Sequence, residues 1–276
     1  MSKRIKAINK IVSLATVSFA LLIAAPLRAA STDTTIDVSS IVKNAEKAAY
    51  YSGKDGRSDA RMMIVDAQGR KQMRQFTILR RDVADNGDQQ MMVFFEIPAD
   101  VKDTVFRVDK HVDLAVEDDR RLYLPALDLV KRISSGDKRT SFVGSHFFYE
   151  DVSGRAISED NFVLQEVTEA AYILKATPKA PDTVEFAYYV VTIDKKTNLP
   201  ILIDFFKANN DNYRRVEAVK VEEIQGFPTV VRSKVSDLES GAYTLMEFRN
   251  IKFDLGLVDD VFTERSLRNP PREWLN

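Results

Sequence analysis

Side chains suited to acid–base or metal chemistry are few and scattered in this sequence. The two histidines, His111 and His146, stand 35 positions apart, and neither belongs to a zinc-binding spacing. There is no cysteine, which excludes disulfides, thiolate metal sites and cysteine nucleophiles. The acidic runs 117–119 and 150–151 could bind a cation, but such runs are more typical of solvated turns. The sequence therefore predicts a protein that is not an enzyme and that has no cofactor and no metal site.

The stretch from 120 to 152 indicates a different kind of chemistry, the binding of an apolar ligand. Four aromatic side chains occupy its second half, on a connection that also contains Gly136 and Gly144. Such side chains either plug the core or form a lid over an apolar cavity. The basic side chains of the same stretch (Lys131, Arg132, Lys138 and Arg139) either meet anionic head groups or face solvent, and a solvated face is the more typical case. The residues predicted to line or gate the cavity are Leu122, Leu124, Leu127, Arg132, Phe142, Gly144, Phe147, Phe148 and Tyr149.

The same stretch resembles the signature of a known family. The matching residues are Leu122–Leu127, Val130, Arg132–Ser134, Lys138, Ser141–Phe142, Gly144–Ser145, Phe147 and Tyr149–Asp151. They are similar to the outer-membrane lipoprotein-sorting (LolA-like) family, whose members often accompany RND/MMPL-type exporters. The resemblance continues more weakly from about Gly56 to the C-terminus. It implies a periplasmic protein with a curved antiparallel sheet, forming an incomplete, half-open barrel in which a few helices close an apolar cavity.

The elements that must position these residues are mostly strands. Long segments rich in Val, Ile, Phe, Tyr and Thr are separated by turn clusters such as Asp85–Asp88 and Gln225–Gly226. Strands joined by such turns predict an antiparallel meander. Alternation predicts a further strand from Val112 to Val116. A helix is expected over Asp37–Tyr51, and a second, shorter one over Asp259–Arg268 before two prolines.

The N-terminus predicts export. Four cationic residues precede an apolar run from Ile11 to Ala25, and small residues follow at Ala29 and Ala30. This order is typical of a cleavable signal peptide, so we expect residues 1–29 to be removed and residues 30–276 to form a single β domain. Without the five basic residues of the leader, 35 basic residues stand against 41 acidic ones. A net charge of −6 argues against nucleic acid as a partner.

Two functions from different classes remain open. The first is a chaperone-like carrier for lipid transport, which would hold the acyl chains of a lipid or an acylated protein and hand them between membrane components. An RND/MMPL-type inner-membrane transporter is the further partner that the resemblance implies. The second is a binding module that senses lipid or envelope stress and signals to a membrane partner. A small outer-membrane barrel is a third interpretation, which the charges on both faces of many strands disfavour.

Overall fold

The computed structural model describes residues 36–85, 87–113 and 115–275. The predicted leader, residues 1–29, lies outside these ranges. From Asp37 onward the chain groups into one compact unit. Its helices are α1 (Val38–Tyr50), α2 (Tyr149–Ser153), α3 (Arg265–Arg268) and α4 (Arg272–Leu275). No helix of the described ranges is long and apolar enough to cross a membrane.

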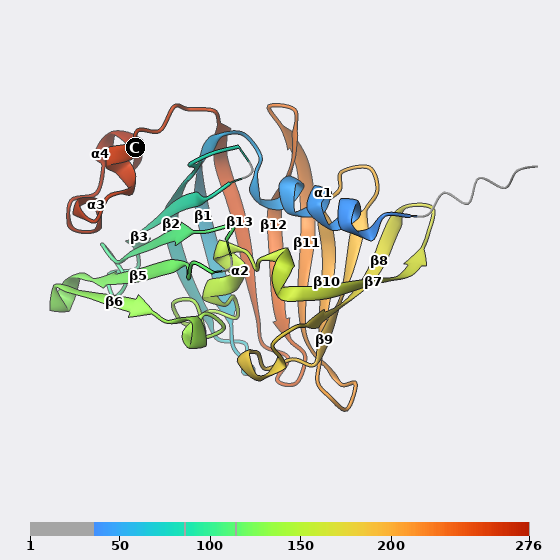
Figure 1. Ribbon diagram of the computed structural model, residues 1–276. Helices are drawn as coiled ribbons and strands as arrows, with labels where there is room; N and C mark the ends of the chain where they lie inside the picture. Colours follow the sequence, from blue (N-terminus) through green and yellow to red (C-terminus); the bar gives the residue numbers. More distant parts are fainter. Residues whose placement is uncertain (1–35, 86, 114, 276) are drawn as a thin grey trace, which may run out of the picture. The chain divides into compact units, whose positions relative to one another are not determined.

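The strands form one antiparallel sheet with the order β6-β5-β4-β3-β2-β1-β13-β12-β11-β10-β9-β8-β7. Strands that follow one another in the chain pair with each other, except β6 and β7. These two are the edge strands of the sheet, and β1 also pairs with β13. Figure 1 shows the strands curving behind α1 and α2. The predicted fold class, a curved antiparallel sheet that is not closed into a barrel, is confirmed. The strands are β1 (Asp55–Val65), β2 (Lys71–Asp82), β3 (Gln89–Ile97), β4 (Val105–Lys110), β5 (Asp119–Leu124), β6 (Leu129–Ile133), β7 (Asp160–Val167), β8 (Ala171–Pro178), β9 (Tyr188–Asp194), β10 (Pro200–Phe206), β11 (Asn212–Ile224), β12 (Phe227–Asp237) and β13 (Tyr243–Phe253).

Local signals explain the elements that flank the sheet. The sequence allowed either Asp37 or Ser39 as the cap of α1; the Asp37 side chain accepts a hydrogen bond from the Ser39 amide, 3.0 Å away, and so caps the helix. Ile41 and Ala45 lie on the buried face of this helix. Between β11 and β12, Gln225 and Gly226 both have positive φ (+51° and +83°), as a two-residue hairpin turn requires.

Two expectations about secondary structure are wrong. The segment around Val112 and Val116 is a loop between β4 and β5, not a strand, and both valines are exposed. The Asp113 carboxylate accepts a hydrogen bond from the Ala115 amide, 2.9 Å away, and this turn competes with an extended backbone. The expected helix over 259–268 is divided into a 3₁₀ turn, Asp259–Phe262, and α3. Thr263 separates them, with extended backbone and a hydroxyl that donates to the Asp260 carbonyl.

The core is divided along the sheet. One apolar cluster lies between β1–β4 and the β6–β7 connection, residues 134–159, and contains Phe76, Phe95, Phe106 and Phe142. A second cluster joins α1 to β8–β10. A third lies beneath the C-terminal turns, around Phe94 and Phe262. The first two clusters flank the concave side of the sheet, where the candidate site lies.

Candidate functional site

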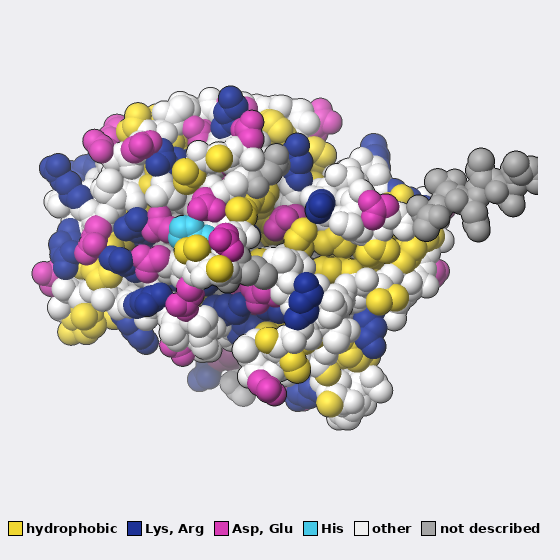
Figure 2. Space-filling view, viewed as in Figure 1, with side chains coloured by type: hydrophobic (Ala, Val, Ile, Leu, Met, Phe, Trp, Pro, Cys, Tyr) yellow, Lys and Arg dark blue, Asp and Glu magenta, His cyan; other side chains and the backbone are white. Residues whose placement is uncertain are grey.

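A cavity of about 370 Å³ lies on the concave side of the sheet. Strands from both halves of the sheet line it, together with the end of α1 and with α2. Its volume is at the lower end of the range of about 300–1,000 Å³ that is usual for small-molecule sites. Figure 2 shows a band of hydrophobic side chains along α1, on the face that the view presents.

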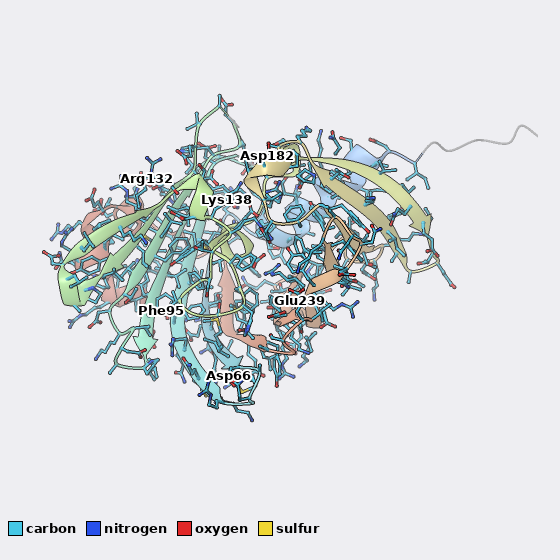
Figure 3. All side chains as sticks on the ribbon, turned by 90° about the horizontal axis from the view of Figure 1, so that it is seen from below. Asp66, Phe95, Arg132, Lys138, Asp182 and Glu239 are labelled. Atoms are coloured by element: carbon cyan, nitrogen blue, oxygen red, sulfur yellow. The ribbon has the colours of Figure 1, made fainter. Side chains whose placement is uncertain are left out.

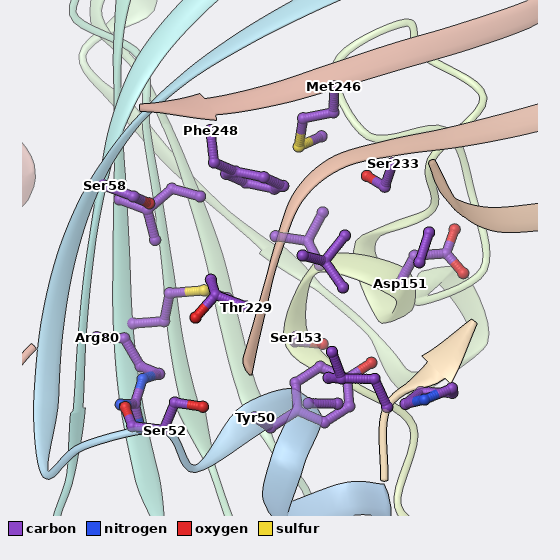
Figure 4. A pocket seen from close by; sticks show the side chains of 18 of the residues that line it. Tyr50, Ser52, Ser58, Arg80, Asp151, Ser153, Thr229, Ser233, Met246 and Phe248 are labelled. Carbon is purple, nitrogen blue, oxygen red and sulfur yellow. The ribbon is translucent and has the colours of Figure 1, made fainter. Parts of the chain in front are cut away.

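Most of the lining is apolar. Phe76, Ile78 and Met91 contribute from β2 and β3, while Ile203 and Val216 contribute from β10 and β11. In Figure 4, Met246 and Phe248 of β13 lie at one end of the cavity, and Tyr50, Ser52 and Arg80 lie at the other. One end of the cavity therefore has a charged side chain, that of Arg80, and the opposite end has the apolar side chains of Met246 and Phe248.

The polar groups at the α1 end hold one another in place. The Arg80 guanidinium donates to the Asp82 carboxylate at 2.5 Å and to the carbonyls of Ser52 and Gly53 at 2.6 and 3.0 Å. The Gln89 amide donates to the Tyr50 carbonyl at 2.8 Å and to Asp82 at 2.7 Å. These hydrogen bonds occupy Arg80 and Gln89, so neither side chain is an uncommitted donor at the site.

Lys110, the last residue of β4, differs from its polar neighbours. Its side chain lines the cavity, is 4% exposed, and has no hydrogen-bond partner for its ammonium. The ammonium lies 5.1 Å from the centre of the Tyr50 ring. Burial lowers the pKa of Lys110, an effect that the charge of Glu46 opposes. Burial likewise raises the pKa of Tyr50 well above its usual range, so the phenol stays neutral.

The predicted aromatic site residues Phe142, Phe147 and Phe148 have different surroundings in the structure. Phe147 lines the cavity. Phe142 does not: it is fully buried, with its ring centre 5.5–6.2 Å from those of Phe76, Phe95, Phe106 and Tyr149. The Phe148 ring lies under the guanidinium groups of Arg139 and Arg214.

The remaining predicted site residues lie outside the cavity lining. Leu122 packs against the first core cluster, Leu124 is half-buried, and Gly144 occupies a left-handed turn with φ of +76°. Leu127 is 71% exposed. Arg132 is also exposed and pairs with Glu117 at 2.9 Å. In Figure 3, Arg132 lies at the outer edge on β6, whereas Lys138 lies further in, between the two halves of the sheet.

A buried ionic cluster fastens the β6–β7 connection. The Glu150 carboxylate lies 3.0 Å from the Lys138 ammonium, 2.7 Å from the Arg139 guanidinium and 3.1 Å from the Arg155 guanidinium. Glu150 is 1% exposed, so the expectation that the 150–151 acids form a solvated turn is wrong. The expectation that Lys138 and Arg139 face solvent is also wrong. Both side chains pair with Glu150 and compensate its charge in the protein interior.

This cluster also joins the connection to the sheet. Arg139 pairs with Glu185 at 2.6 Å, and Arg155 pairs with Asp160 of β7 at 2.8 Å. Asp151 pairs with Arg214 of β11. Burial alone would raise the pKa of Glu150, but the charges of Arg139, Arg155 and Lys138 outweigh it and lower the pKa to about 2. Glu150 is therefore ionised at neutral pH.

The histidines take part in separate local contacts. His111 pairs with Asp88, with 2.7 Å between its Nδ1 and a carboxylate oxygen. The Nδ1 of His146 lies 2.8 Å from the Thr244 hydroxyl of β13. Within the described ranges, no group of three or more His, Asp or Glu side chains is arranged to hold a metal ion.

Of the predicted site residues only Phe147 lines the cavity, and Lys110 is one of the lining residues that sequence reasoning missed. A signal for it exists in the sequence, because Phe106, Val108 and Lys110 alternate on one face of β4 and the first two are buried. A lysine in phase with buried apolar residues indicates an inward-facing charge.

Comparisons with known proteins agree on the fold. A family model described as that of an uncharacterized protein matches residues 87–269, which is more than half of the chain. The chain belongs to this family. A DUF1329 family protein from Desulfovibrio piger, known from a crystal structure, is 28% identical in sequence to this chain. The two structures have a TM-score of 0.74, and the match covers 82% of this chain and 95% of that one. No curated protein matches the chain.

Two further crystal structures share the architecture. A putative outer membrane lipoprotein-sorting protein domain from Vibrio parahaemolyticus is 23% identical, with a TM-score of 0.73, covering 83% of this chain and 97% of that one. A LolA superfamily protein from Nitrosomonas europaea is 15% identical, with a TM-score of 0.64, covering 83% and 99%. The predicted resemblance to LolA-like proteins is thus confirmed, and at these identities it concerns the fold.

Proposed function

We propose that this protein is a periplasmic carrier that binds acyl chains of a lipid or lipoprotein in its concave cavity and hands them between membrane components. The observation that carries the proposal is the mostly apolar cavity of about 370 Å³ lined by the open sheet, α1 and α2. Exposing an acyl chain to water costs about 0.8 kcal/mol per methylene, so transfer through an aqueous compartment requires an apolar container. The LolA-like fold supports the same function.

The leader and the family resemblance support the remaining parts of the proposal. A signal peptide over residues 1–29 would deliver the chain to the periplasm, where lipids must cross between two membranes. An RND/MMPL-type transporter in the inner membrane is the proposed donor or acceptor. Binding and release form and break no covalent bond, so the carrier needs no catalytic group and is not an enzyme.

Native mass spectrometry of protein purified from its own periplasm tests the proposal directly. We expect the protein to carry an acyl-containing species that organic extraction removes, and the stripped protein to bind a fluorescent fatty acid. Ala218→Trp places an indole in the cavity, and we expect it to abolish both forms of binding.

Val219→Trp is the matched control, because Val219 is the next residue of β11 and is 48% exposed. It should bind as the wild type does. Wild-type protein that carries no lipid and binds none would refute the carrier proposal. Equal binding by the two tryptophan variants would place the ligand outside this cavity.

A further inference from the structure

The Lys110 ammonium is a buried charge that no group of the described chain compensates by direct contact. Its carbon stem follows Phe106 and Val108 on the inward face of β4, and its Nζ has no hydrogen-bond partner. The carboxylates of Glu46, Asp118 and Glu159 act on it electrostatically, but no ion pair with Lys110 forms among the described residues. A buried charge without a partner is costly in free energy, so a lysine at this position beside the cavity requires an explanation.

Lys110 is exceptional among the buried polar groups of the described ranges. Five other buried nitrogen or oxygen atoms lack a partner, but each belongs to a side chain that forms a hydrogen bond or ion pair through another atom. They are Nε of Arg74, Arg107 and Arg232, Nη1 of Arg214 and Oδ1 of Asn212. Among the six buried side chains of the described ranges that have an unpartnered polar atom, only Lys110 has its whole charged group without a hydrogen bond.

Gly154 and the Tyr50 ring lie close around the buried Lys110 ammonium. A β-carbon at Gly154 would lie 3.0 Å from the Lys110 Nζ and 3.0 Å from the Tyr50 ring, and Gly154 has φ of +82°. Only glycine therefore fits between α2 and this lysine without displacing it. The Tyr50 ring, 5.1 Å from the ammonium, stabilises the cation without neutralising it.

We propose that Lys110 binds the carboxylate of a free fatty acid whose acyl chain fills the apolar part of the cavity. This inference rests on the proposed carrier function and narrows its ligand to a single-chain anionic amphiphile. The head group would lie near Lys110 and Tyr50 at the α1 end, and the chain would extend toward Met246 and Phe248 at the opposite end.

Charge balance favours a carboxylate over a phosphate. A phosphate monoester carries between one and two negative charges at neutral pH and calls for more than one cation. The other cation in the cavity lining at this end, Arg80, is committed to Asp82 and to two carbonyl groups. One uncommitted ammonium matches the single charge of a carboxylate.

Ligands that share one chain length test this inference on the wild-type protein. Stripped protein is titrated at pH 7.5 with palmitate, hexadecanol and hexadecyl phosphate, each competing with a fluorescent fatty acid. We expect palmitate to bind roughly ten- to a hundredfold more tightly than hexadecanol, the effect of one charge-assisted hydrogen bond. Equal affinities for the acid and the alcohol would overturn the inference. Binding of hexadecyl phosphate at least as tight as that of palmitate would overturn the carboxylate assignment.

Lys110→Met should remove the preference for palmitate and leave the hexadecanol affinity unchanged. Methionine replaces the unpartnered charge with an apolar side chain, so we expect the variant to fold with an unchanged or higher melting temperature. Lys110→Gln provides a second uncharged variant. Lys175→Met is the matched control, since Lys175 also lies over a tyrosine ring, that of Tyr188 at 3.8 Å, but does not line the cavity.

The outcomes separate this inference from the carrier proposal. If wild-type protein carries no lipid from its periplasm and binds no single-chain ligand, the carrier proposal itself fails. If it carries a lipid but binds none of the three single-chain ligands, the carrier proposal stands and the fatty-acid inference fails. If palmitate and hexadecanol bind equally and Lys110→Met changes neither affinity, the cavity binds acyl chains but Lys110 does not recognise a carboxylate.

Discussion

The Glu150 cluster, defined as Glu150 with Lys138, Arg139 and Arg155, offers a quantitative test of how the β6–β7 connection is held. Glu150→Gln keeps the shape of the side chain and removes its charge, as protonation does. Each cation of the cluster keeps a second acid, such as Glu185 for Arg139 and Asp160 for Arg155. The substitution should therefore weaken the cluster without leaving any of its cations wholly unpaired.

The expected magnitude follows from the pKa of Glu150, which is lowered from 4.5 to about 2 in the folded protein. One pKa unit corresponds to about 1.4 kcal/mol, so ionised Glu150 contributes about 3 kcal/mol to the free energy of unfolding. Because the folded-state pKa is lowered, this contribution is complete above pH 4.5. It is lost as the pH falls from 4.5 toward 2.

Urea unfolding of wild type and Glu150→Gln from pH 7 down to pH 3 measures this effect. At pH 7 we expect Glu150→Gln to unfold more easily by about 3 kcal/mol, and the difference between the two proteins to shrink below pH 4.5. Glu239→Gln removes an acid that is 59% exposed and paired with Lys207, and it should change little at any pH. A difference between wild type and Glu150→Gln that stays constant with pH would refute the assignment of the low pKa to Glu150.

Three further predictions concern the connection, the histidines and the leader. Phe142→Ala should lower the free energy of unfolding by about 3–5 kcal/mol in a urea titration, because the ring is fully buried among four others. A loss below about 1 kcal/mol, together with weaker lipid binding, would show instead that the ring belongs to a movable gate. His111→Gln with His146→Gln should leave lipid binding unchanged, and loss of function in a folded double variant would indicate an enzyme. Intact mass of the exported protein should place its first residue at Ala30 or Ser31, whereas recovery of the full-length chain would contradict cleavage.

Features that depend on neighbouring residues could be predicted from the sequence. The Asp37 cap and the spacing of Ile41 and Ala45 predict α1 because capping and helical periodicity operate within a few residues. The Gln225–Gly226 hairpin could be predicted for the same reason, since the turn needs positive φ at two adjacent positions. The Val112–Val116 loop shows the limit of this reasoning, because alternation alone ignores the hydrogen bonds of Asp113.

Features that depend on distant parts of the chain could not be predicted. Adjacent aromatic residues such as Phe147 and Phe148 look equivalent in the sequence, yet Phe147 faces the cavity and Phe148 lies under Arg214, which is 66 positions away. Glu150 resembles a solvated acid although Arg139 and Arg155 stand only 11 and 5 positions away, because its burial depends on how the connection packs against the sheet. Alternation on β4 places Lys110 on the buried face, but its neighbours Tyr50 and Gly154 are 60 and 44 positions away in the sequence.

The β6–β7 connection joins the two halves of the sheet through side chains, where a closed barrel would use backbone hydrogen bonds between its edge strands. Phe142 and Tyr149 pack against Phe106 of β4, and Asp151 pairs with Arg214 of β11. Backbone pairing between β6 and β7 would fix the distance between these strands at about 4.8 Å, whereas a side-chain junction leaves room for α2. Because Phe147 and the α2 residues Asp151–Ser153 line the cavity, the connection forms part of the cavity wall. Substitution of Phe147 should therefore change how tightly the proposed carrier binds an acyl chain, while substitutions at Lys110 should change which head groups it accepts.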